Sequence, residues 1–312
     1  MTLVEARAVG KRYGAHLALS DVSFTLVPGV VTALVGANGS GKSTLLKRMI
    51  GLVLGSGQTT FDGRTYPYLD NPVSTVGLAL DVQQLDTAQT PRSHLTRVAR
   101  ACGAPAAAID EFLAVLDLSH VQGKRVAKLS LGMRQRLSLA AALLPDPEVL
   151  LLDEPGNGMD PAGLHWLQDL VRSRAEDGRT VLLSSHLLTD VEACADRILV
   201  VDRGRLLFDG DLESFVRPWG AAERVIAKCG NPELLLEAVR GFGAVNAAID
   251  DSGSVAVDGL DVHAVASAAV AVGAVLHEVR PDRRDLDTAY FDLLATRTAT
   301  PARTEAVDRV LA

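Results

Sequence analysis

The stretch GANGSGKST, residues 36–44, decides the fold of this 312-residue chain. It matches the pattern G-x-x-x-x-G-K-[ST] and lies between an apolar run at residues 30–35 and a helix-like segment that starts at Thr44. Glycines let successive backbone N–H groups point into one concavity, and a helix start adds partial positive charge, so this loop suits a polyphosphate. A glycine turn that only joins strand to helix is the weaker interpretation, because all fixed positions of the pattern are present in the right context.

Each residue of the loop is therefore a candidate contact to ATP. Lys42 is expected to reach the β- and γ-phosphates, and the Ser43 hydroxyl is expected to ligate Mg²⁺. The candidate nucleotide contacts in the loop are Gly36, Ala37, Asn38, Gly39, Ser40, Gly41, Lys42, Ser43 and Thr44.

A second motif, which ends in two acidic residues before a proline, is VLLLDEP, residues 149–155. Asp153 ends an apolar strand and is expected to hold Mg²⁺ through water, whereas Glu154 is expected to polarise the attacking water as the general base. An acidic strand end is ordinary when taken alone. Together with the phosphate loop it indicates a chain that binds and hydrolyses a nucleoside triphosphate.

The order of apolar runs predicts two domains. Strands alternate with helices up to about residue 219, which favours an α/β core with a mainly parallel sheet, and residues 91–128 are Ala-rich and helical in pattern. Residues 220–295 follow a βαββαβ order, which predicts a small ferredoxin-like α+β domain. Residues 296–312 are expected to form a poorly ordered tail.

Composition narrows the class of protein. Hydrophobic residues make up 48% and charged residues 22%, as in an average globular chain, and the net charge of −7 has the wrong sign for a nucleic-acid binder. The three cysteines have no C-x-x-C spacing, so neither a disulfide framework nor a zinc site is indicated. With no secretory signal and no apolar run of about 20 residues, we expect a cytoplasmic protein.

Between the two nucleotide elements lies LSLGMRQR, residues 129–136, which resembles the LSGGQ signature of ATP-binding-cassette (ABC) ATPases. Ser130 precedes Asp153 by 23 residues (153 − 130), the spacing of that family. GNGMD at 156–160 is similar to the family's D-loop, and LSSH at 183–186 is similar to its H-loop. The resemblance covers about residues 3–217 and implies a P-loop NTPase core of ABC type.

The resemblance also implies how the site works. Two cassettes would close head to tail, with each ATP held between the phosphate loop of one subunit and the signature of the other, at Ser130 and Gly132. His186 would contact the γ-phosphate, and the D-loop residue Asp160 would face the nucleotide. Tyr13 stands where the family places an aromatic ring that stacks on adenine.

Three positions depart from the family pattern. The family usually has a γ-phosphate-sensing Gln at the end of a strand, and the matching stretch VGLALD, residues 76–81, ends in Asp81. Asp81 could still ligate Mg²⁺ through water, while Gln83 or Gln84 could be the true equivalent. Leu131 replaces the first glycine of the signature, and Met133 replaces its Gln or Glu.

The resemblance is closest to bacterial drug- and antibiotic-resistance exporter ATPases of the daunorubicin and bacitracin type. It implies a homodimer on the inner face of the cell membrane that drives a separate polytopic permease, with no nucleic-acid partner. A soluble mechanochemical ABC ATPase, a small-molecule kinase and an importer subunit remain alternatives. The transported compound leaves no trace in the sequence.

Overall fold

The computed structural model describes residues 2–80, 82, 85–216, 224–282 and 285–298. The chain divides into two compact units, residues 1–212 and 213–312. The boundary expected at residue 219 lies outside the described residues, and the first unit already ends at Leu212. Asp81, Gln83 and Gln84 also lie outside them.

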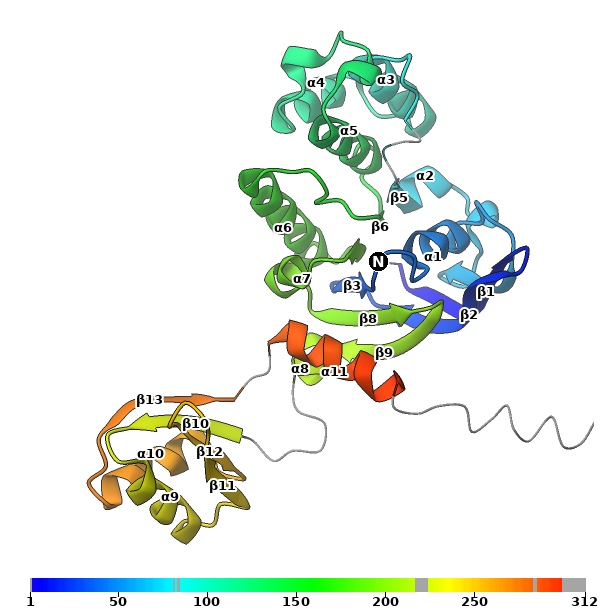
Figure 1. Ribbon diagram of the computed structural model, residues 1–312. Coiled ribbons are helices and arrows are strands. Elements are labelled where there is room, and N and C mark those ends of the chain that lie inside the picture. The colour runs from blue at the N-terminus through cyan, green and yellow to red at the C-terminus, as the bar shows by residue number, and fades with distance from the viewer. Residues whose placement is uncertain (1, 81, 83–84, 217–223, 283–284, 299–312) are drawn as a thin grey trace, which may run out of the picture. The chain divides into compact units, whose positions relative to one another are not determined.

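A six-stranded sheet forms the centre of the first unit (Figure 1). Five strands run parallel, and the edge strand β9 is antiparallel to β8. The central strands are fully buried and mostly apolar, as expected where both faces of a sheet are covered. In sheet order the strands are β5 (Val76–Ala79), β6 (Val149–Leu152), β7 (Thr180–Ser185), β3 (Val31–Val35), β8 (Arg197–Asp202) and β9 (Arg205–Asp211).

A three-stranded antiparallel sheet covers part of this core. Its order is β2-β1-β4, and its strands are β1 (Val4–Tyr13), β2 (His16–Leu26) and β4 (Ser56–Phe61). Side chains from this sheet and from the six-stranded sheet share one buried apolar cluster with helix α1 (Lys42–Met49). The phosphate loop therefore leads from a buried strand into a helix whose inner face is fixed by two sheets.

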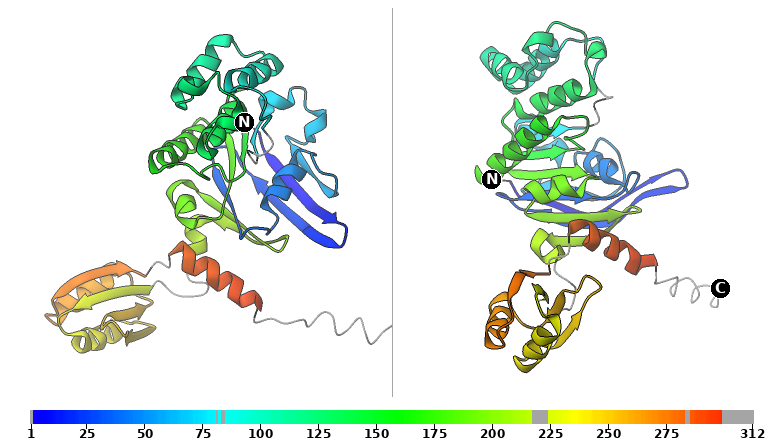
Figure 2. Two further views of the ribbon diagram at one scale, coloured as in Figure 1. Left: turned by 45° about the horizontal axis from the view of Figure 1, so that its top comes forward. Right: turned by 60° about the vertical axis from the view of Figure 1, so that its left-hand side comes forward.

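Helices form a separate layer in Figures 1 and 2, away from the β1–β2 hairpin. They share their own apolar cluster, which includes Leu95, Leu113 and Leu137. The elements are α3 (Pro91–Cys102), α4 (Ala106–Val115), α5 (Leu131–Leu143) and two 3₁₀ segments, Ser119–Val121 and Val126–Lys128. The layer thus includes the region expected to be helical, and α5 carries the signature.

The remaining helices of the first unit flank the sheet. They are α2 (Pro72–Thr75), α6 (Pro161–Glu176) and α7 (Leu188–Cys194), with a 3₁₀ turn at Tyr66–Tyr68, and α8 (Leu212–Val216) starts where the unit ends. Across the described residues, no helix combines the length and the apolar character needed to cross a membrane.

The second unit contains the predicted βαββαβ order. Its sheet has the order β11-β12-β10-β13 and is antiparallel throughout, which is the ferredoxin-like arrangement. The elements are β10 (Arg224–Cys229), α9 (Pro232–Gly241), β11 (Asn246–Ile249), β12 (Val255–Asp258), α10 (Val262–Ala271), β13 (Leu276–Pro281) and α11 (Leu286–Thr298). Helix α11 continues past Thr296, where the tail was expected to begin; residues 299–312 lie outside the described residues.

One close packing contact yields a stability prediction. A Cβ atom at Gly77 of β5 would lie 2.3 Å from the carbonyl oxygen of Ala142 in α5 and 2.5 Å from Cγ of Pro147. Because backbone cannot give way as a flexible side chain can, Gly77→Ala should lower the free energy of unfolding by about 2 kcal/mol in urea unfolding followed by circular dichroism. The matched control is Gly123→Ala, whose new methyl group meets open space and should change it by less than about 0.5 kcal/mol. Equal midpoints for the two variants would contradict this packing.

Candidate nucleotide-binding site

The phosphate loop has a backbone conformation at Gly41 that favours glycine. Gly41 has a φ of 114° at the N-cap of α1, and a Cβ there would lie 2.7 Å from the carbonyl oxygen of Ala18. The tip, residues 37–39, is exposed, and so is Ser43 at the start of α1. The loop therefore presents its backbone and the Ser43 hydroxyl outward while its base is tightly packed.

Lys42 is the buried cation of the site. Only 4% of its side chain is exposed, and its Nζ donates to the Gly36 carbonyl oxygen at 2.7 Å and to the Ala37 carbonyl oxygen at 3.4 Å. The same Nζ lies 3.3 Å from Oε1 of Glu154. A buried ammonium is stable only with such compensation, so the loop and Glu154 are electrostatically coupled.

Asp153 is buried at the end of β6 and is held by the neighbouring strand. Its Oδ1 accepts a 2.8 Å hydrogen bond from the Ser184 hydroxyl of β7. Its backbone N–H donates to the Ala79 carbonyl oxygen at the end of β5. Three adjacent strand ends therefore fix this residue, and Ser184 engages only one of its two carboxylate oxygens.

Glu154 has a strained backbone that side chains hold in place. Its φ of 47° lies in the left-handed region, which costs a residue with a Cβ about 1–3 kcal/mol. Its N–H donates to Ser184 Oγ at 2.9 Å, and its carbonyl oxygen accepts from Gln135 Nε2 at 3.2 Å. Two side chains from distant segments thus fix both peptide groups of Glu154.

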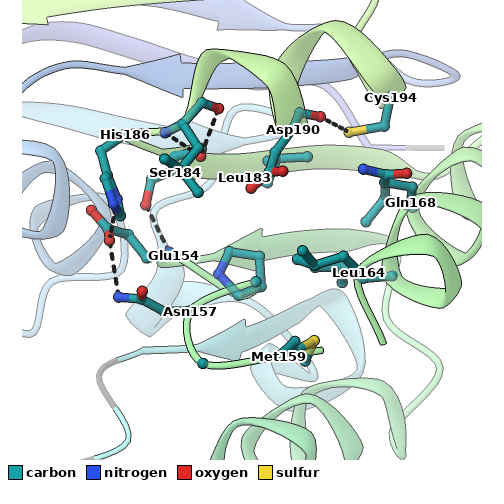
Figure 3. Close-up of a pocket in the computed structure, with 17 residues that line it drawn as sticks. Glu154, Asn157, Met159, Leu164, Gln168, Leu183, Ser184, His186, Asp190 and Cys194 are labelled. Carbon is teal, nitrogen blue, oxygen red and sulfur yellow. Dashed lines mark hydrogen bonds and ion pairs between the residues drawn. The ribbon is translucent and has the colours of Figure 1, made fainter. Parts of the chain in front are cut away.

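This turn aims the Glu154 carboxylate at three groups. Besides the contact of Oε1 with Lys42, Oε2 lies 2.8 Å from His186 Nδ1 and 3.3 Å from Asn157 Nδ2. Figure 3 shows His186 and Asn157 on either side of the carboxylate. The expected general base, the expected phosphate-binding lysine and the expected H-loop histidine therefore meet at one point.

The signature residues lie at the start of α5, against the loop at 156–160. Ser130 is the N-cap of α5, and its hydroxyl accepts from the Met133 N–H at 3.2 Å. Gly132 approaches Gly158 so closely that a Cβ would lie 2.6 Å from the Gly158 carbonyl oxygen. Asp160 caps α6 by accepting from the Gly163 N–H.

The oxygen donors of the site can be compared with the ligands that Mg²⁺ prefers. Asp153 and Ser43 offer oxygen ligands of the kind Mg²⁺ prefers, and Ser184 leaves the second oxygen of Asp153 to other partners. Within the part of the chain that the structure describes, no cluster of three or more His, Cys, Asp or Glu side chains could hold a metal. The oxygen donors of Asp153 and Ser43 fit an ion bound by one or two protein groups together with substrate phosphates.

Comparison with known proteins identifies the family. The family profile described as ABC transporter matches residues 19–157. The lantibiotic transport ATP-binding protein SrtF of Streptococcus pyogenes is 32% identical over 212 residues, which cover 68% of this chain and 92% of that protein. This chain belongs to the ABC transporter ATP-binding subunits.

Further relatives agree with this identification of an ABC-type ATPase. The Nod factor export ATP-binding protein I of Rhizobium leguminosarum bv. viciae is 33% identical over 213 residues, 66% of this chain and 68% of that protein. A solved structure titled as the ATP binding subunit of an ABC transporter has a TM-score of 0.63 and 28% identity, covering 70% of this chain and 93% of that one.

One expected contact of this ABC subunit stands apart from the cluster around Glu154. Tyr13 ends β1 and is 46% exposed, with Lys11 Nζ 4.6 Å from its ring centroid. An exposed aromatic ring beside a lysine is open to stacking, and its role with adenine stays a prediction.

Sequence reasoning assigned no role in the site to Gln135, Ser184 or Asn157. Ser184 and Asn157 lie inside the motifs that were recognised, but only the fold shows that their side chains contact Asp153 and Glu154. Gln135 lies in the signature segment, and no sequence signal marks it as a partner of the Glu154 carbonyl oxygen.

The Ser184 hydroxyl, which joins Asp153 Oδ1 to the Glu154 N–H, can be removed by substitution with alanine. Ser184→Ala should lower the free energy of unfolding by about 1–3 kcal/mol, because a buried carboxylate oxygen and the Glu154 N–H both lose their partner, and it should slow ATP turnover. Ser185→Ala is the matched control, since its hydroxyl contacts only Leu187 among the described residues. Equal turnover in the two variants would show that Ser184 does not position the acidic pair.

Proposed function

We propose that this chain is the ATP-binding and hydrolysing subunit of an exporter for drug, antibiotic or lipid-like compounds. The observation that carries the proposal is the Glu154 carboxylate held between Lys42 Nζ and His186 Nδ1. This arrangement combines a cation for phosphate, a base for water and a histidine that orients the base, which are among the groups that promote phosphoryl transfer to water.

The contacts suggest how the site responds to ATP. Lys42 now uses loop carbonyl oxygens and Glu154 as partners, and phosphate oxygens would take over the role of its counter-charge. Glu154 would then be free to accept a proton from the attacking water, while His186 and Asn157 keep its second oxygen in position. The exposed N–H groups at residues 37–39 would hold the phosphates.

Asp153 and Ser43 are the proposed holders of Mg²⁺, with Asp153 acting through water. When bound, the ion would neutralise the charge that develops on the β- and γ-phosphates. The fixed position of Asp153, between the ends of β5 and β7, supports this assignment.

A second copy of the chain would complete the site. The exposed Ser130 hydroxyl and the adjacent N-terminal N–H groups of α5 could face the γ-phosphate bound by a partner subunit. Gly132 would allow close approach, and Asp160 would lie at the subunit interface. The position of Ser130 and Gly132 at the start of α5, outside the described contacts of Glu154, supports this proposed dimer.

A transport role is favoured by the relatives, whose names refer to lantibiotic transport and Nod factor export. The protein would act at the cytoplasmic face of the membrane, where the helical region at about residues 91–128, together with the segment after Asp81, would receive a separately encoded permease. The second unit, with the domain expected at 220–295, would stabilise or regulate the dimer. A soluble mechanochemical ABC ATPase has no comparable support.

Replacing the proposed base gives a two-part prediction. Glu154→Gln should reduce ATP turnover by about a hundredfold or more, because amides do not accept the proton. It should also accumulate an ATP-bound dimer and raise the ATP-induced shift in thermal midpoint above that of the wild type, because Lys42 loses its counter-charge until phosphate supplies one. Lys42→Ala is the control and should show neither binding nor turnover. A Glu154→Gln protein that stays monomeric and active would refute the assignment.

The membrane partner can be sought with the same variant. Tagged Glu154→Gln protein, purified from native membranes in mild detergent, should carry a stoichiometric polytopic membrane protein that mass spectrometry identifies. Wild-type protein purified in the same way is the control, because it should not accumulate the ATP-bound dimer expected for Glu154→Gln. Recovery of ribosomal or DNA-repair proteins with no membrane protein would support the mechanochemical alternative instead.

A further inference from the structure

A cavity of about 180 Å³ opens beside Glu154 and His186 and extends between α6 and α7. Figure 3 shows Glu154, His186 and Asn157 toward one end, and Gln168 and Cys194 at the other. No residue of the phosphate loop at 36–44 lines it. The cavity is therefore a separate space that shares a wall with the nucleotide site.

The missing side chain at Gly156 leaves room on one side of the cavity. A Cβ on Gly156 would lie 2.7 Å from Leu164 Cδ2 and 3.7 Å from Asp190 Oδ2, both of which are cavity walls. A larger residue here would point into this space. Most of the remaining walls are apolar and buried, with Leu167, Val171 and Leu183 each less than 10% exposed.

Two polar groups that line this space have no hydrogen-bond partner in the described part of the chain, although nearby His186 acts electrostatically on Asp190 and favours its charged form. Among the described residues, neither the Asp190 carboxylate nor the Gln168 amide makes a hydrogen bond, although both line the cavity. Burial raises the pKa of Asp190, as expected for a carboxylate that has lost water without gaining a donor. Burial also raises the pKa of the Cys194 thiol to about 11, so that the neighbouring thiol stays neutral.

We propose that this cavity binds a small organic cation, with one apolar ring against the leucines and a protonated amine at Asp190. The size fits one ring, since an apolar cavity of about 150 Å³ holds a benzene-sized ligand. The charge fits because the walls contain two carboxylates, Asp190 and Glu154, and no lysine or arginine. Glu154 is already paired with Lys42 and His186, which leaves Asp190 for the amine. Gln168 adds an acceptor for a second N–H of the amine.

An occupant of the cavity would act on ATP hydrolysis. The walls include residues 156–159 together with Glu154 and His186, so a ligand would contact the segment that positions the proposed base. This site goes beyond the proposed transport function, and its binding can be measured without nucleotide. Failure of ligand binding would therefore leave the ATPase assignment intact, and failure of the ATPase assignment would leave this site intact.

Benzylamine is the probe, and its uncharged analogue benzyl alcohol is the comparison, with binding to the full chain measured by calorimetry. Wild-type protein should bind benzylamine in saturable fashion, and Asp190→Asn should weaken it about tenfold or more, the ratio expected for a hydrogen bond to a charged group. Benzyl alcohol should bind Asp190→Asn as well as it binds the wild type. No saturable binding of benzylamine to the wild type, or equal binding by Asp190→Asn, would overturn the proposal.

A second pair of variants tests the space itself. Leu164→Phe should abolish benzylamine binding by filling the cavity, whereas the volume-conserving Leu164→Met should retain it within about threefold. Retained ATP binding and thermal midpoint would show that Leu164→Phe is folded. A folded Leu164→Phe protein that binds benzylamine as tightly as the wild type would place the ligand elsewhere and refute the site.

Discussion

The rest of the site depends on one buried positive charge, the ammonium group of Lys42. With 4% of the side chain exposed, it cannot rely on water and must be neutralised by protein or ligand. The chain meets this demand with the Gly36 carbonyl oxygen and with Glu154, which links the phosphate loop to the end of β6. Because phosphate carries the same sign as Glu154, nucleotide would replace the carboxylate in the proposed ATP complex without leaving the ammonium unpaired. The pairing of Lys42 with Glu154 therefore supports the proposed role of the loop in binding a polyphosphate.

Holding Glu154 in a left-handed conformation requires support from distant segments. Ser184 from β7 and Gln135 from α5 bond its two peptide groups, and Arg136 of α5 lies 3.1 Å from Asp160 at the start of α6. The helix that carries the signature is thus joined at two points to the segment that carries the proposed base. A displacement of α5 would therefore change the position of Glu154. The coupling between this helix and the proposed base runs through a side-chain hydrogen bond and an ion pair, in addition to the connecting backbone.

Local sequence patterns predicted most of the fold, because several segments have strong periodic or motif signals. These segments are the phosphate loop, the buried strands at 149–152 and 180–184, and the βαββαβ order of the second unit. Strand β4, with the sequence SGQTTF, was not predicted, since only its pairing with β1 makes a half-polar segment a strand. Gln135 was missed for a similar reason, because its partner is a backbone carbonyl oxygen 19 residues away. The cavity beside Gly156 likewise comes from the packing of three elements. Features that depend on contacts between segments far apart in the chain, such as these, could not be predicted from local sequence patterns.

Leu131, which replaces a glycine of the family's signature, shows how a contact between remote segments can explain a difference from the family pattern. Taken alone, Leu131 removes backbone freedom from a motif that normally has glycine there. In the structure its side chain lies against Gly158, where a Cβ would be 3.0 Å from Leu131 Cδ2, and Gly158 has a φ of 75°. Ser130 still caps α5, and Gly132 still reaches the Gly158 carbonyl oxygen. Glycine at position 158 leaves room for the leucine, so the two positions form one packing unit.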